Sequence, residues 1–238
     1  GNTPFLIKTY GGYGVIEKPS FDPGIISFIE NGGAFAYVHI RGGGEFGYKW
    51  WQEGRNLKKR NGILDFIKAA EYLINEGYTK PRKIGIIGSS HGGFIAGAAM
   101  IEKPNLFGAA VINVGVLDVL RFEKTEAGAA YVNRNEFGTV KKKEEFNNML
   151  SFSPFHNINE AINYPSTLII TGTNDSRVPP YQSYKFAGKL QNGLKQKNPI
   201  LLWTQENEGH YGASQYNSYI TELTFKYSFL INELTKTD

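Results

Sequence analysis

The most constraining stretch of this chain is a glycine-bounded turn that carries two serines, at residues 88–93. An apolar run at residues 84–87 precedes it, and a segment of mostly small residues at 94–100 follows it. A buried strand, a tight turn and a helix can hold one side chain in a strained conformation at the strand end. Glycines two positions before and after that side chain let the neighbouring backbone pass closely. Ser90 has glycine at both positions and Ser89 does not, so we expect Ser90 to be the nucleophile.

Strand-like and helix-like segments alternate on both sides of this turn. Strands are expected at residues 5–10, 34–40, 83–87, 109–114, 165–172 and 199–204, and the main helices at 61–77, 94–100, 181–191 and 223–234. Strands that alternate with helices form a mostly parallel sheet. With a serine turn after a central strand, this order predicts an α/β-hydrolase fold with helices on both faces of the sheet. Residues 118–163 lack a strand pattern and are expected to lie as an insertion over the C-terminal edge of the sheet.

Length and composition fit one globular domain spanning residues 1–238. The chain is 41% hydrophobic and 20% charged, and α/β sheets of this size usually stay within one domain. No window approaches the roughly 18 consecutive apolar residues of a membrane span, and the N-terminus lacks a signal-peptide pattern. We therefore expect no membrane contact and a cytoplasmic location. Because the chain begins with Gly1 rather than Met, we also expect it to be a processed or excised piece.

Composition excludes several classes of site. The chain has no cysteine, which rules out disulfides, thiolate metal sites and a cysteine nucleophile. Its histidines are scattered without ligand spacing, so no metal or other cofactor is expected. The basic runs at residues 58–60 and 141–143 are short and lack interleaved aromatic residues. Both are therefore predicted to be solvated faces rather than nucleic-acid contacts.

Chain order selects the histidine that would serve Ser90. In α/β-hydrolases the catalytic residues follow the order serine, acid, histidine, each on a loop at the end of a strand. His39 precedes the serine inside an expected strand, His91 lies in the turn itself, and His156 precedes the strand that should carry the acid. His210 follows the last expected strand in a glycine-flanked loop. His210 is therefore the histidine whose position in the chain fits the expected order.

The same order selects the acid. Asp175 lies in a turn just past a buried strand, between Ser90 and His210. Asp118 also follows a strand and is the second choice, one strand too early for the usual arrangement. His210 would take the serine proton and Asp175 would orient the imidazole, so that an acyl-enzyme forms and is then hydrolysed.

Two backbone features are expected to stabilise the oxyanion of this reaction. The His91 N–H directly follows the nucleophile, and its imidazole is predicted to pack beside the site rather than act as a second base. The glycine-rich stretch at residues 11–14 follows the first expected strand, where α/β-hydrolases place part of the oxyanion hole. Taken alone, that stretch also fits a simple turn with buried aromatic residues.

The chain resembles the catalytic domain of the prolyl oligopeptidase family of serine peptidases. The matching segments extend over almost the whole chain, and the Arg-Gly-Gly-Gly-Glu run and the Asp-x-Arg-Val run are the most specific of them. They cover residues 10–14, 40–47, 70–79, 88–93, 172–179 and 209–210.

The resemblance implies three further roles. Tyr10 matches the tyrosine whose hydroxyl is the second oxyanion donor, and Arg177 matches the arginine that holds a substrate carbonyl. Tyr131 falls near the position of a tryptophan that stacks on the substrate proline, so the change to tyrosine bears on proline preference. The resemblance also implies partner segments that residues 1–238 do not contain, a β-propeller domain and an N-terminal segment of the same parent protein.

Three functions are weighed on these residues. The first is a serine peptidase that hydrolyses short peptides after proline or another apolar residue, without strong preference for a basic residue. The second is a carboxylesterase of the same fold, and Arg177 argues against it because a peptide carbonyl needs such a donor and a simple ester does not. The third is a non-catalytic binding fragment, and the presence of Ser90, Asp175 and His210 together argues against that.

Overall fold

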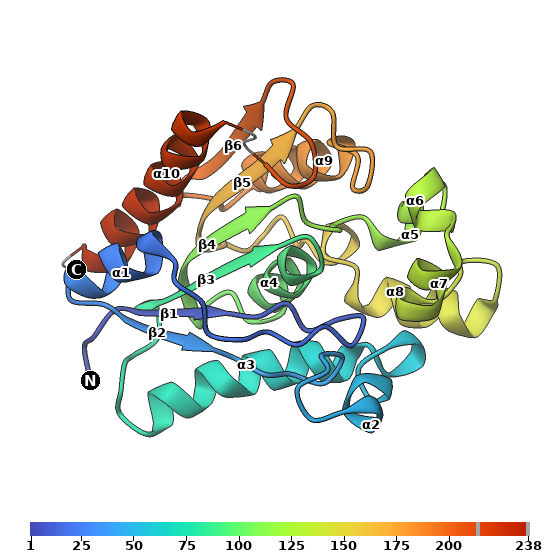
Figure 1. The fold of residues 1–238 in the computed structure, drawn as a ribbon, viewed down its shortest axis with the longest axis horizontal. Helices are drawn as coiled ribbons and strands as arrows, with labels where there is room; N and C mark the ends of the chain where they lie inside the picture. Colours follow the sequence, from blue (N-terminus) through green and yellow to red (C-terminus); the bar gives the residue numbers. More distant parts are fainter. Residues whose placement is uncertain (213–214, 237–238) are drawn as a thin grey trace.

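A computed structural model describes residues 1–212 and 215–236. Over these residues the chain forms a six-stranded sheet in the order β2-β1-β3-β4-β5-β6, and every neighbouring pair of strands is parallel (Figure 1). This confirms the predicted α/β-hydrolase class with a parallel central sheet. The strands are β1 (Phe5–Lys8), β2 (Ala34–Tyr37), β3 (Ile84–Ser89), β4 (Phe107–Asn113), β5 (Ser166–Gly172) and β6 (Ile200–Gln205).

Helices cover both faces of this sheet. On one face, α1 (Pro23–Glu30) and α10 (Tyr216–Thr235) lie side by side (Figure 1) and share an apolar cluster with alternate strand residues such as Ala109 and Val111. On the other face, α3 (Arg60–Asn75), α4 (His91–Glu102) and α9 (Tyr181–Gln191) form the larger cluster with Ala110 and Ile112. Because successive side chains of β4 point to opposite faces, one buried strand contributes to both clusters.

The region between β4 and β5 carries helices and no strand in the part of the chain that is described, as predicted. Its helices are α5 (Val119–Phe122), α6 (Glu126–Ala129), α7 (Tyr131–Phe137) and α8 (Lys143–Phe152). They lie together on the right of Figure 1, beyond the sheet. Phe137 and Phe152 are buried in the larger core cluster, so these helices are packed against the body of the fold.

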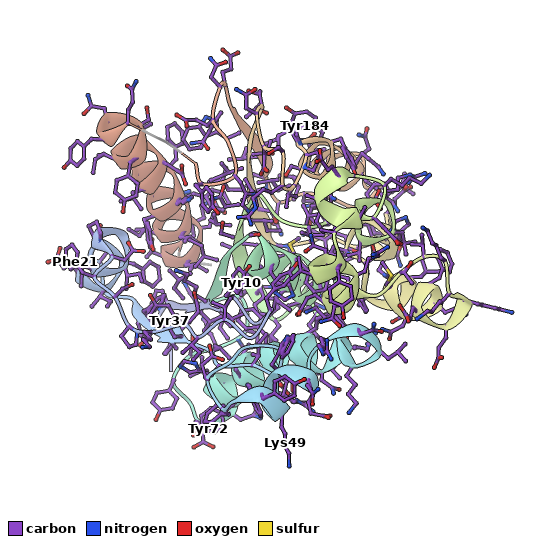
Figure 2. All side chains as sticks on the ribbon, turned by 45° about the vertical axis from the view of Figure 1, so that its right-hand side comes forward. Tyr10, Phe21, Tyr37, Lys49, Tyr72 and Tyr184 are labelled. Atoms are coloured by element: carbon purple, nitrogen blue, oxygen red, sulfur yellow. The ribbon has the colours of Figure 1, made fainter. Side chains whose placement is uncertain are left out.

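Two strands are shorter than the sequence pattern predicts. β1 ends at Lys8 and β2 at Tyr37, because the chain bends away there into glycine-rich loops. Tyr10 and His39 therefore lie beyond the strands rather than inside them. Figure 2 shows Tyr10 near the middle of the view, whereas Phe21 and Tyr72, both exposed, lie at the edge of the molecule.

One prediction about the basic runs is wrong. Lys59, expected on a solvated face, is completely buried and donates a hydrogen bond to Glu136 of α7, which is buried as well. Trp51, in the short helix α2 (Tyr48–Gln52), donates to the other oxygen of the Glu136 carboxylate at 3.1 Å. A buried charge needs an opposite charge and hydrogen bonds to offset its desolvation. The pair therefore ties α7 to the start of α3. The other run, at residues 141–143, is exposed as predicted.

Within the described residues, none of the helices combines the length and the apolar character needed to cross a membrane.

The buried ion pair generates a stability prediction. Lys59→Met leaves the Glu136 carboxylate buried without its counter-charge and should lower the free energy of unfolding by about 3–5 kcal/mol. Lys58→Met is the matched control, because Lys58 is exposed and pairs with the exposed Glu53, and it should cost about 0–1 kcal/mol. Urea unfolding of both variants measures the difference. Equal effects would contradict a buried, paired Lys59.

Candidate active site

Ser90 occupies the sharp turn between β3 and α4. Its backbone has φ 56° and ψ −116°, a region that non-glycine residues rarely adopt and that stores strain. Two backbone hydrogen bonds hold the turn: Ser90 N donates to Asn113 O at 2.9 Å, and Phe94 N donates to Ser90 O at 3.0 Å. The first bond reaches the end of β4 and the second begins α4. The serine is thus fixed at the carboxyl edge of the sheet.

The glycines around Ser90 are required by close backbone contacts. A Cβ added at Gly88 would lie 2.1 Å from Gly92 O, and one added at Gly92 would lie 2.4 Å from Thr9 O. Both distances are far below van der Waals contact. This gives the physical reason for the spacing seen in the sequence, because the turn closes on itself and on the end of β1.

His210 links the serine to the acid. Its Nε2 lies 2.9 Å from Ser90 Oγ, and its Nδ1 lies 2.8 Å from Asp175 Oδ2. A carboxylate can only accept, so Nδ1 carries the proton and Nε2 is left to accept the serine proton. The three side chains selected by chain order therefore form one hydrogen-bonded row of the kind that activates a serine.

Asp175 is buried and held by the loop after β5. Its Oδ1 accepts hydrogen bonds from the backbone N–H groups of Arg177 at 2.9 Å and Val178 at 2.8 Å. These bonds leave Oδ2 facing His210. The hydrogen bonds between the aspartate side chain and the turn backbone, which the sequence predicted, thus orient the carboxylate toward His210.

Asp118, the second choice for the acid, belongs to another cluster. It is fully buried, pairs with Lys185 of α9, and caps α5 by accepting a hydrogen bond from Arg121 N at 3.1 Å. Its carboxylate is committed to these partners rather than to His210.

The two residues predicted to donate to an oxyanion, His91 and Tyr10, both come from elements next to Ser90. His91 is the first residue of α4, and the first N–H groups of a helix have no acceptor inside that helix. Tyr10 lines the same cavity as Ser90. Burial raises the pKa of Tyr10, partly offset by the contact with Ser90, so the hydroxyl keeps its proton and can donate it.

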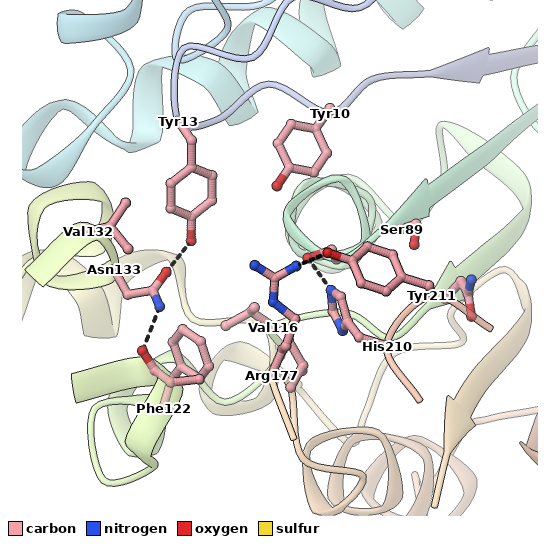
Figure 3. Close-up of a pocket in the computed structure, with 14 residues that line it drawn as sticks. Tyr10, Tyr13, Ser89, Val116, Phe122, Val132, Asn133, Arg177, His210 and Tyr211 are labelled. Carbon is pink, nitrogen blue, oxygen red and sulfur yellow. Dashed lines mark hydrogen bonds between the residues drawn. The ribbon is translucent and has the colours of Figure 1, made fainter. Parts of the chain in front are cut away.

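A cavity of about 430 Å³ opens in front of Ser90 (Figure 3). This volume suits a small side chain or a short peptide segment. One wall is apolar and consists of Val116, Phe122, Ala127, Val132 and Val178. Polar groups lie next to this wall, since Tyr13 OH donates to Asn133 Oδ1 at 2.6 Å and Asn133 Nδ2 donates to Ala127 O at 2.7 Å.

Arg177 stands at the mouth of the cavity. Its guanidinium donates a hydrogen bond to the Tyr211 hydroxyl and lies 5.5 Å from the centre of the Tyr211 ring. Tyr211 follows His210 directly and is 87% exposed. Figure 3 shows the pair next to His210, so a cation is available close to the serine.

The structure does not bring Tyr131 to this cavity. The side chain is 76% exposed, and the next two residues of α7, Val132 and Asn133, line the cavity instead. Sequence reasoning missed both of these residues and the cavity role of Tyr13. Tyr13 lies in the glycine-rich stretch already singled out, and Val132 and Asn133 directly follow Tyr131, so these positions were the available signals.

No group of three or more carboxylate or imidazole side chains within the described ranges is arranged to hold a metal ion.

Comparisons with known proteins identify the family of the chain. The model of the prolyl oligopeptidase family matches residues 19–237. The chain belongs to the prolyl oligopeptidase family. A prolyl endopeptidase of Elizabethkingia meningoseptica is 39% identical over 235 residues, and one of Dictyostelium discoideum is 37% identical over 239 residues; each match covers 98% of this chain. Protease 2 of Moraxella lacunata is 34% identical over 235 residues.

Solved prolyl oligopeptidase family structures share the fold. A prolyl endopeptidase structure superposes with a TM-score of 0.95 at 38% identity, covering 98% of this chain and 34% of that one. A post-proline cleaving enzyme from Rickettsia typhi has a TM-score of 0.93 at 30% identity, covering 98% of this chain and 33% of that one. The chain spans about a third of the length of the curated relatives, with 33% of the Elizabethkingia protein and 31% of the Dictyostelium protein.

Proposed function

We propose that residues 1–238 are the catalytic domain of a serine peptidase that hydrolyses short peptides after proline or another apolar residue. The observation that carries this proposal is the row Ser90–His210–Asp175, which opens into a cavity with an apolar wall. The names of the relatives, prolyl endopeptidase and protease, support the same reaction class.

The chemistry follows from the roles of these groups. Ser90 Oγ attacks the scissile carbonyl carbon while His210 Nε2 takes the hydroxyl proton, and Asp175 stabilises the imidazolium that results. The negative oxygen of the tetrahedral intermediate accepts hydrogen bonds from His91 N–H and Tyr10 OH. His210 then gives its proton to the leaving amine as the C–N bond breaks. Water, activated by the same imidazole, hydrolyses the acyl-enzyme and frees Ser90.

The cavity supports a small apolar residue before the scissile bond. Val116, Val132 and Val178 offer a wall that a proline ring can contact, and no Asp or Glu is among the described side chains that line the cavity. A basic residue would therefore lack a counter-charge. We assign the apolar contact on α7 to Val132, in place of the stacking role expected of Tyr131.

The parent protein is proposed to carry further segments. Because the chain matches only about a third of each relative, a β-propeller domain and an N-terminal segment of the same protein are proposed partners of this domain. The cytoplasmic location expected from the sequence stays a prediction.

A carboxylesterase is the second candidate, since it would use the same three residues. Arg177 favours the peptidase, because it lines the same cavity as Ser90 and its guanidinium could donate to a substrate carbonyl. A non-catalytic fragment is disfavoured by the intact hydrogen-bonded row.

Labelling with a fluorophosphonate tests the nucleophile. The wild-type protein should be labelled and should cleave a chromogenic peptide with proline before the scissile bond, and Ser90→Ala should abolish both. Ser89→Ala is the matched control, because it removes the neighbouring hydroxyl and should leave labelling intact. Labelling that survives in Ser90→Ala would contradict the assignment.

Removal of the arginine separates the two hydrolase candidates. Arg177→Ala should lower kcat/KM for the peptide by about 10- to 100-fold, as expected for a hydrogen bond from a charged group worth roughly 1.5–3 kcal/mol. The same variant should hydrolyse a small nitrophenyl ester at the wild-type rate. An equal loss on both substrates would contradict a role of Arg177 that is specific to peptides.

A further inference from the structure

The imidazole of His91 lies directly beneath the active site. The residue is 1% exposed, and its ring is surrounded by the rings of Tyr10, Tyr13, Phe94 and Phe137 at centroid distances of 5.6, 5.5, 5.3 and 5.5 Å. The backbone of the loop after β1 rests on it. A Cβ added at Gly12 would lie 2.6 Å from His91 Cε1.

The hydrogen bond of this ring defines its protonation. His91 Nδ1 lies 2.7 Å from the backbone oxygen of Tyr10. A carbonyl can only accept, so Nδ1 carries the proton and donates it. Burial, with the nearby Lys59 ammonium, lowers the pKa of His91 to about 3. The ring is therefore neutral at ordinary pH, and Nε2 carries a lone pair.

The far edge of the ring meets the buried ion pair. His91 Nε2 lies 3.8 Å from Glu136 Oε1, and the same carboxylate oxygen accepts a hydrogen bond from Lys59. Nε2 has no hydrogen-bond partner among the described atoms. Lys59 already neutralises the Glu136 carboxylate, so Glu136 has little tendency to pull a second proton onto His91.

Tyr10 needs an anchor of this kind. It lies two residues past the end of β1 at Lys8, so the hydrogen bonds of the sheet do not hold it. Its carbonyl is bound by His91, and its side chain lines the same cavity as Ser90. His91 would thus present its backbone N–H to the oxyanion, and its side chain fixes the carbonyl of Tyr10, the residue expected to supply the other donor.

We propose that His91 is a positioning residue for the oxyanion hole, and that its Nδ1–H holds Tyr10 in register with Ser90. The proposal rests on the proposed peptidase function and adds a role to a side chain that is otherwise only packed in the core. Its consequence is that the Tyr10 hydroxyl is effective only while His91 donates.

A double-mutant cycle tests this dependence. Tyr10→Phe removes the hydroxyl and should lower kcat for the proline peptide by about 10²–10³-fold with little change in KM, as for loss of one oxyanion donor. His91→Phe keeps a ring and removes the donor, and should also lower kcat rather than raise KM. In the His91→Phe background, adding Tyr10→Phe should cost less than about tenfold, because the hydroxyl is already misplaced. Multiplicative losses would overturn the proposal.

Two further measurements keep the result decisive. His39→Phe is the control for exchanging a histidine, since His39 contacts Glu45 and Phe46 and lies outside the cavity, and it should leave kcat unchanged. If His91→Phe does not fold, the same cycle with His91→Leu, which also removes the donor, decides, and the cost of Tyr10→Phe should again shrink.

The tautomer can be observed without any turnover. Long-range ¹H–¹⁵N spectra of the wild-type protein should show His91 neutral and protonated at Nδ1. A proton on Nε2 would overturn the proposal even if the protein is an active peptidase. Conversely, absence of Ser90 labelling would reject the proposed function and leave this hydrogen bond intact.

Discussion

The structure depends on the strained backbone of Ser90. A non-glycine residue at φ 56° and ψ −116° costs of order 1–3 kcal/mol and persists only where the surroundings enforce it. Here β4 binds the serine N–H, α4 begins on its carbonyl, and Gly88 and Gly92 permit backbone contacts that no side chain would allow. α4 is buried along almost its whole length, so apolar packing offsets the strain. The Ser90 hydroxyl is therefore held at the carboxyl edge of the sheet.

The partners of Ser90 come from distant parts of the chain. His210 binds it from the loop after β6, Asp175 binds His210 from the loop after β5, and Tyr10 lines the same cavity from the loop after β1. A parallel sheet brings the carboxyl ends of all its strands to one edge, which is why residues so far apart in sequence meet there. The helices between β4 and β5 then supply one wall of the cavity.

Buried polar contacts join this edge to the cavity wall. Glu136 of α7 binds Lys59 and Trp51 and faces the ring of His91, while Asn133, one turn earlier on the same helix, binds Tyr13 at the cavity. The helix that lines the cavity is therefore attached to the layer of side chains beneath Ser90. In a low-dielectric interior such a network is costly when only partly formed, and this favours one arrangement of its members.

Local patterns were sufficient to predict the sheet, the main helices and the residues of the hydrogen-bonded row. Buried strands appear in the sequence as apolar runs, and Asp175 and His210 were selected because each lies in a loop that follows such a run. Lys59 could not be predicted to be buried, because its counter-charge is 77 positions away in the sequence and its neighbours are basic. The exposure of Tyr131 could not be predicted either. The side of a seven-residue helix that faces the cavity is decided by contacts with other elements.

A crystal structure of the protein with a peptidyl boronic acid tests the central claim most directly. The account predicts a covalent bond from boron to Ser90 Oγ, with one boron-bound oxygen about 2.7–3.1 Å from both His91 N and the Tyr10 hydroxyl. The apolar side chain of the inhibitor should contact Val116, Val132 and Val178. A bond to any other residue, or an oxygen turned away from both donors, would contradict it.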